Sequence, residues 1–219
     1  VSLSADMYHR FGAFQCNLLL EGFYTRLNHV FILEEIGKDE EHNAVIKERR
    51  NGQGAEVAGV TVEGKVAYLS LVQLQAGVTW QKSHYTRPEK WSKDSSVPAE
   101  KRIFRTPDWY GYFTATYSPV KPLNIALSGT YTGSMIVQHM KGYIPKDIAV
   151  TTPDFFDMNL KISYDFSLYK FITLQLNAGI QNIFNAYQRD FDRGKERDSG
   201  YIYGPSMPRS YFAGAKLMF

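Results

Sequence analysis

Cysteine is almost absent from this sequence, with Cys16 the single one in 219 residues. One cysteine excludes both an internal disulfide and a cysteine metal cluster. Net charge is also small, at +3 from 25 basic and 22 acidic residues. Nucleic-acid-binding domains concentrate far more basic charge than this. The composition therefore gives no support for a nucleic-acid partner.

Long apolar runs are missing as well. No stretch approaches the ~20 apolar residues that a transmembrane helix needs, and mean hydropathy is −0.32. The absence of such runs does not exclude a membrane β-barrel, because the hydropathy signal of barrel strands is much weaker. No signal peptide is present and the chain starts at Val1, so we expect a processed protein or a fragment. Aromatic residues, by contrast, make up 15% of the chain.

Apolar and polar residues alternate with a period of two along most of the chain. In the last ten residues, for example, every second residue from Tyr211 to Phe219 is apolar. Such alternation predicts strands, and no stretch has a helical period. We expect about nine strands, near residues 1–9, 14–33, 44–68, 72–80, 109–117, 123–132, 156–166, 172–181 and 210–219.

Short and long connections alternate between these predicted strands. The short turns are expected near Gly12, Leu69, Pro119 and Tyr169, and the polar segment 34–43 begins the first long loop. Further long loops follow Arg87, His139 and Gln188. Outer-membrane barrels combine short periplasmic turns with long external loops. The pattern predicts an all-β, antiparallel transmembrane β-barrel in the outer membrane of a Gram-negative bacterium.

The apolar row of these strands is expected to face lipid. In the last five segments it carries no charge, whereas the opposite row contains Asp157, Lys161 and Asp165. A basic residue at the bilayer midplane costs ~2–4 kcal/mol, so the charged row must face inward. Aromatic pairs on the apolar row have the spacing of two membrane-interface belts: Trp109 with Tyr117, Phe156 with Phe166, and Tyr211 with Phe219.

Nine strands do not close a bacterial barrel, whose strand number is even. Residues 1–219 are therefore expected to form the carboxyl-terminal part of a larger barrel.

Four segments resemble TonB-dependent outer-membrane receptors. Residues 177–187 resemble the penultimate strand of that family, with its Asn-Leu-Phe-Asn sequence and a Tyr, and residues 204–219 resemble its closing segment. Upstream, 22–27 and 51–60 resemble its "Phe-Tyr-Thr" strand and its Asn-x-Gly…Gly-x-Glu strand, although the acid Glu63 comes two residues late. The similarity extends over essentially the whole chain.

This resemblance implies a 22-stranded barrel around an amino-terminal plug domain. It implies, as partners, the TonB complex acting through a missing amino-terminal region, the plug, the remaining strands, outer-membrane lipid and lipopolysaccharide. The function implied is receptor and transporter for a scarce large nutrient: an iron-siderophore, haem or a cobalamin. No enzymatic activity and no resident cofactor are expected. The alternatives are a passive outer-membrane pore or adhesin barrel, and a soluble all-β binding module.

No catalytic or metal-binding motif stands out. The histidines, His9, His29, His42, His84 and His139, lack metal-ligand spacing. Residues 190–194 are similar to a calcium loop but lack its downstream glutamate, which favours a salt-bridged, solvated loop.

Ligand contacts are expected in the external loops. Residues 87–105 contain six basic and three acidic residues, an excess that attracts an anionic metal chelate or, alternatively, lipopolysaccharide phosphates. The candidate ligand-binding residues are Tyr85, Trp91, Arg102, Arg105, His139 and Tyr143.

Overall fold

Strands are the regular secondary structure of the described chain. The structure is a computed structural model that describes residues 1–28, 31–39, 41–42 and 44–219. Within these ranges no helix is long and apolar enough to cross a membrane. The strands are β1 (Ser2–Phe11), β2 (Phe14–Leu27), β3 (Phe31–Asp39), β4 (Ala44–Asn51), β5 (Ala55–Tyr68), β6 (Val72–Glu89), β7 (Glu100–Arg102), β8 (Trp109–Val120), β9 (Leu123–Thr132), β10 (Ile136–His139), β11 (Ile148–Thr151), β12 (Phe155–Tyr169), β13 (Ile172–Gln181) and β14 (Ser210–Met218).

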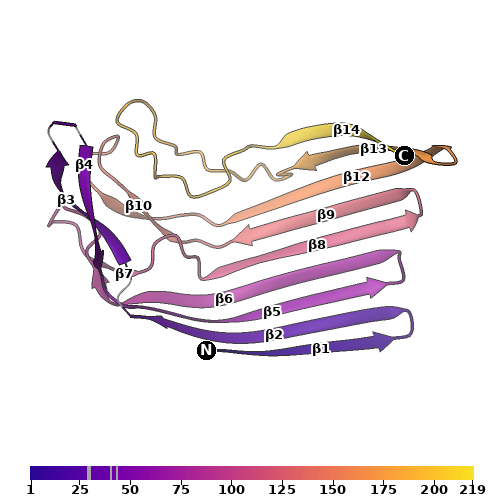
Figure 1. Ribbon diagram of the computed structural model, residues 1–219, viewed down its shortest axis with the longest axis horizontal. Helices are drawn as coiled ribbons and strands as arrows, with labels where there is room; N and C mark the ends of the chain where they lie inside the picture. The colour runs from indigo at the N-terminus through magenta and orange to yellow at the C-terminus, as the bar shows by residue number, and fades with distance from the viewer. Residues whose placement is uncertain (29–30, 40, 43) are drawn as a thin grey trace.

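One antiparallel sheet contains nine long strands in the order β1-β2-β5-β6-β8-β9-β12-β13-β14, with β7 beside β6. Each long strand pairs with the next long strand along the chain, as Figure 1 shows. The pairings are long: β2 and β5 match from Phe14↔Tyr68 to Leu27↔Ala55. The prediction of about nine antiparallel strands is confirmed.

Short turns and long connections lie at opposite ends of this sheet (Figure 1). The turn between β1 and β2 contains Gly12 at φ +58, a left-handed conformation that glycine adopts without steric cost. Leu69, at φ 50, lies in the turn between β5 and β6, where the Leu71 amide donates to the Tyr68 carbonyl at 3.1 Å. The predicted sorting of loop lengths by end is confirmed.

No large side chain in the middle of the apolar row is buried: these side chains are exposed or half-exposed in the described strands. Ile162 is 42% and Leu217 is 49% exposed, and Leu174 pairs with Leu217 on the same face. Aromatic rings on this row form two bands. Trp80 and Trp109 pair at 6.4 Å toward the long-loop end, and Phe14 and Tyr68 pair at 4.6 Å beside the short turns. The apolar side chains thus form no water-excluded core of a sandwich, which agrees with the lipid-facing assignment.

The buried apolar residues of the described chain lie at the long-loop end instead. They are Ala55, Ile136, Val137, Phe155 and Tyr201. There the segment 182–209 covers the polar row of the sheet: the Phe155 ring lies 6.0 Å from the Tyr203 ring. A Cβ at Gly204 would come within 2.5 Å of the Phe155 ring, so only glycine fits this close approach. The loops therefore pack on the polar face, the face predicted to point inward.

Three local predictions were wrong. The strand expected over residues 44–68 is divided into β4 and β5, which belong to different sheets. Residues 14–33 were expected to form one strand, but β2 ends at Leu27, and the predicted loop 34–43 overlaps a β3–β4 hairpin with register from Phe31↔Asn51 to Asp39↔Ala44. This hairpin pairs with no other strand in the described chain. Its backbone hydrogen bonds are satisfied by local pairing, which requires no apolar face and so leaves no alternation to detect. Residues 29, 30, 40 and 43 lie outside the described residues.

Candidate functional site

Three long connections, residues 90–108, 133–154 and 182–209, contact one another and are called the loop cluster below. The Arg105 amide donates to the Ile136 carbonyl at 2.8 Å. The Arg105 guanidinium donates to the carbonyls of Gly200 and Ile202. Arg105 lies in the first connection and is hydrogen-bonded to backbone carbonyls of the other two. Its backbone has a left-handed φ of 60°.

A buried histidine lies at the centre of the loop cluster. His139 stacks on Tyr201 with ring centroids 3.7 Å apart and planes 8° from parallel. Its Nε2 lies 2.9 and 3.0 Å from the two carboxylate oxygens of Asp192. Both side chains are nearly inaccessible, at 8% and 2% exposure. Asp192 also accepts the Asp198 amide at 2.9 Å, so one carboxylate holds two segments together.

A second carboxylate, Asp190, accepts two tyrosine hydroxyls. Tyr203 donates at 2.6 Å and Tyr201 at 2.9 Å. Burial raises the pKa of Asp190, but these two hydrogen bonds outweigh it and hold the pKa below its ordinary value. Burial, followed by the hydrogen bond to Asp190, raises the pKa of Tyr201 to about 12 and also raises the pKa of Tyr203.

These tyrosines predict an alkaline transition in the loop cluster. Because the pKa of Tyr201 is raised when folded, its contribution to stability is complete below the ordinary tyrosine pKa of ~10. The contribution is lost as pH rises toward about 12. Hydrogen exchange of residues 182–209, measured relative to the base-catalysed rate of an unfolded chain, should therefore accelerate between these pH values. In Asp190→Asn the acceleration should begin at lower pH, because the tyrosines lose a charged acceptor. An unchanged profile would contradict the assignment.

Two asparagines shape the start of the segment 182–209. Asn182, at φ 51, donates from Nδ2 to the carbonyls of Ala186 and Met207, both at 3.0 Å, and its Oδ1 accepts the Ala186 amide at 2.8 Å. Asn185, at φ 56, accepts the Arg209 amide at 2.9 Å. Asparagine tolerates this left-handed conformation better than most residues. These bonds explain why asparagine occupies the first and last positions of the Asn-Ile-Phe-Asn sequence.

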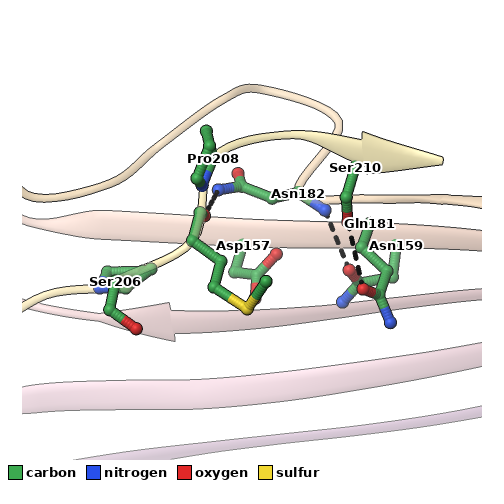
Figure 2. A pocket seen from close by; sticks show the side chains of 9 residues that line it. Asp157, Asn159, Gln181, Asn182, Ser206, Pro208 and Ser210 are labelled. Atoms are coloured by element: carbon green, nitrogen blue, oxygen red, sulfur yellow. Dashed lines mark hydrogen bonds between the residues drawn. The ribbon is translucent and has the colours of Figure 1, made fainter.

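A polar pocket of about 320 Å³ opens where this segment meets the sheet. Figure 2 shows Asp157 and Asn159 of β12 and Gln181 of β13 beside Ser206 and Pro208 of the loop. The remaining lining residues are Asn182, Pro205, Met207 and Ser210. A second pocket of about 250 Å³ lies beyond it, and its lining includes Phe155, Tyr187, Gln188, Asp190 and Tyr203.

The six predicted ligand residues do not share one pocket. Arg105 and His139 lie inside the loop cluster, where they bind the segment 182–209. Trp91 packs against Phe104 at 5.3 Å and donates to the Pro98 carbonyl at 3.1 Å. Arg102 is exposed and pairs with Glu100 at 3.2 Å, and Tyr143 is 56% exposed. Tyr85 is half-buried in β6, opposite Ala55.

Sequence reasoning missed the residues of both pockets. Asp157, Asn159 and Gln181 belong to the polar row, but nothing in the alternation separates them from other inward residues. Of the described residues, no three His, Cys, Asp or Glu side chains are grouped to hold a metal ion. The carboxylates of the calcium-loop-like segment accept hydrogen bonds from Tyr201, Tyr203 and the Asp198 amide, and Asp192 contacts His139. His29 lies outside the described residues.

Comparison with solved structures identifies this fold in siderophore receptors. The ferric-catecholate import receptor Fiu of Escherichia coli K12 matches with a TM-score of 0.60 and 16% identity, over 99% of this chain and 27% of the receptor. The siderophore receptor PirA of Acinetobacter baumannii matches with a TM-score of 0.58 and 13% identity, over 100% of this chain and 31% of the receptor. The ferripyoverdine receptor of the Pseudomonas aeruginosa outer membrane matches with a TM-score of 0.59 and 12% identity, over 99% of this chain and 26% of the receptor.

No protein-family model and no curated protein sequence matches the chain. The chain spans less than a third of the length of these solved receptors. Its fold, an antiparallel sheet of long strands with long connections at one end, is the fold that these receptors have over the matched part. The matched proteins are transport receptors and not enzymes. The fold-level prediction from residues 177–187 and 204–219 is thereby confirmed.

Proposed function

We propose that this chain is the carboxyl-terminal part of an outer-membrane receptor for TonB-energised uptake of an iron chelate. The observation that carries the proposal is the loop cluster: three loops, fixed to one another, lie over the polar face of a sheet with a siderophore-receptor fold. A fixed cluster at the end of a barrel is suited to recognise a large ligand, because little conformational entropy remains to be lost on binding.

Charge supports an anionic ligand. All six basic residues of segment 87–105 are exposed, and they outnumber the three acidic ones. Clustered charge of one sign raises the local concentration of oppositely charged ligands. Two of the matched structures are a ferric-catecholate import receptor and a ferripyoverdine receptor. On that basis we extend an iron-chelate ligand to this chain, ahead of haem and cobalamin.

The sheet calls for further strands. β1 and β14 are its two edges, and unpaired edge groups cannot be left in lipid. We propose that additional strands close a barrel of 22 strands around a plug domain, which contacts the polar row and couples to TonB. Lipid contacts the apolar row, and lipopolysaccharide contacts the exposed basic loops.

Within this proposal the predicted ligand residues divide into two groups. Arg102, Tyr143, Trp91 and Tyr85 remain candidates for direct ligand contact. Arg105 and His139 act as positioning residues, because their polar groups are engaged by Gly200, Ile202 and Asp192.

Replacement of Arg102 tests the ligand proposal. In the full-length protein, Arg102→Ala combined with Tyr143→Ala should weaken binding of a ferric catecholate chelate about tenfold, which corresponds to ~1.4 kcal/mol. Loop protection in hydrogen exchange should stay unchanged. Lys121→Ala, in a short turn at the opposite end of the sheet, is the matched control and should leave affinity unchanged. Equal affinities in all three proteins would remove these loops from the binding site.

Uptake measurements separate the receptor from the alternative functions. Cells should accumulate the iron chelate only when TonB is present. Uptake that is independent of TonB would indicate a passive pore, and binding of host surfaces without uptake would indicate an adhesin.

A further inference from the structure

An unpaired carboxylate faces the 320 Å³ pocket of Figure 2. Asp157 lies on the polar row of β12, opposite Thr130 of β9. Its Oδ1 is buried, and among the described residues it is the buried side-chain N or O atom that has no hydrogen-bond partner. Leaving a buried acceptor unsatisfied costs ~1–3 kcal/mol, and more when the group is charged.

Comparable carboxylates in the described chain are paired. Asp165, on the same row of β12, accepts the Gln175 amide at 2.8 Å. Asp147, in the loop cluster, accepts the Ser92 hydroxyl at 2.6 Å and the Lys141 amide at 2.6 Å. The lack of a donor is therefore specific to Asp157 and is not a general property of acidic residues in this sheet.

The neighbours of Asp157 do not provide the missing donor. The Asn182 side-chain amide is already committed to the Ala186 and Met207 carbonyls. The pocket lining contains no lysine or arginine. Two further oxygens of the lining act as acceptors, since Asn159 Oδ1 accepts the Asn182 amide at 2.9 Å and Gln181 Oε1 accepts the Ser210 hydroxyl at 3.2 Å. The pocket lining thus contains one carboxylate without a partner and no basic side chain, and the amide oxygens of Asn159 and Gln181 are already engaged.

We propose that this pocket binds a cationic N–H donor group, a guanidinium or an alkylammonium, with Asp157 as its counter-ion. Guanidinium and carboxylate groups pair through two parallel hydrogen bonds, which would satisfy the buried oxygen. The inference rests on the proposed function, in which the polar row lines the barrel interior. The cation comes either from an arginine or lysine of the protein enclosed by the barrel, or from a free ligand that enters it.

Asp157→Asn tests the pocket in the full-length, detergent-solubilised protein. Asp165→Asn is the matched control, because it removes a charge from the same row where a partner is present. Methylguanidinium is the probe, with its binding measured by calorimetry and the unfolding midpoint measured for each variant.

If a free ligand supplies the cation, methylguanidinium binds the unaltered protein and binds Asp157→Asn about tenfold more weakly or worse. If a protein side chain supplies it, methylguanidinium does not bind, and Asp157→Asn lowers the midpoint by about 2 °C or more, beyond any effect of Asp165→Asn. The proposal is overturned if the probe binds both proteins equally. It is also overturned if no probe binds and Asp157→Asn is at least as stable as the unaltered or control protein.

Ferric-chelate uptake by the same strains separates the two proposals. If cells that carry the unaltered protein show no TonB-dependent uptake, the proposed function is contradicted. The probe and midpoint measurements on protein extracted from the outer membrane report on the pocket alone.

Discussion

Leu176→Arg should prevent most of the protein from assembling in the outer membrane. Leu176 lies in the middle of β13, is 44% exposed, and pairs with Tyr164 and Ala215 on the apolar face. An arginine near the bilayer midplane costs ~2–4 kcal/mol, which corresponds to about a 30-fold to 1,000-fold loss in the folding equilibrium. The fraction of full-length protein in outer-membrane preparations, and its denaturant midpoint in vesicles, measure this effect.

The adjacent residue provides the control for the membrane face. Gln175 points to the opposite side of β13 and donates to Asp165 at 2.8 Å. An arginine there keeps a donor beside Asp165, so Gln175→Arg should assemble normally. If both variants assemble equally, the apolar row does not face lipid and the barrel assignment is wrong.

Asp192→Ala should release the loop cluster. The carboxylate is 2% exposed and contacts both His139 and the Asp198 amide. Removing the carboxylate leaves the His139 ring nitrogen and the Asp198 amide without an acceptor, and each buried group left unsatisfied costs ~1–3 kcal/mol. The loss here should be confined to the loops, because the sheet strands pair independently of them. Hydrogen exchange in residues 133–154 and 182–209 should therefore accelerate about 100-fold or more, with β12 and β13 unaffected.

A carboxylate elsewhere in the same segment distinguishes this effect from a general loss of charge. Glu196 is exposed, so Glu196→Ala should leave exchange of both connections unchanged. Under the proposed function, Asp192→Ala should also weaken chelate binding, since the ligand would have to order the loops again. Strong binding with unprotected loops would show that the cluster does not preorganise the site.

Strand number, strand direction and the apolar face of the sheet were predictable because they depend on local alternation. The side-chain period in a strand is two, so a sequence that must place every second residue in lipid shows that constraint directly. Residues such as Ile162 and Lys161 therefore reveal their faces without any knowledge of the pairing. The hairpin β3–β4 was missed because its pairing is satisfied locally and requires no apolar face.

The candidate site was less predictable, since its residues meet through contacts across long sequence separations. His139 and Asp192 are 53 residues apart, and Arg105 contacts Gly200 and Ile202 at separations of 95 and 97. Basic charge and aromatic content predicted ligand contacts in these loops, but they did not indicate that Arg105 and His139 bind other loops.

The sequence by itself determined that this chain forms strands with one continuous apolar face, because the period-two alternation specifies the face of each residue separately. Only the tertiary structure decided which loop side chains are engaged and that Asp157 has no partner. Those properties depend on which distant segments the sheet brings together, and no single segment encodes them.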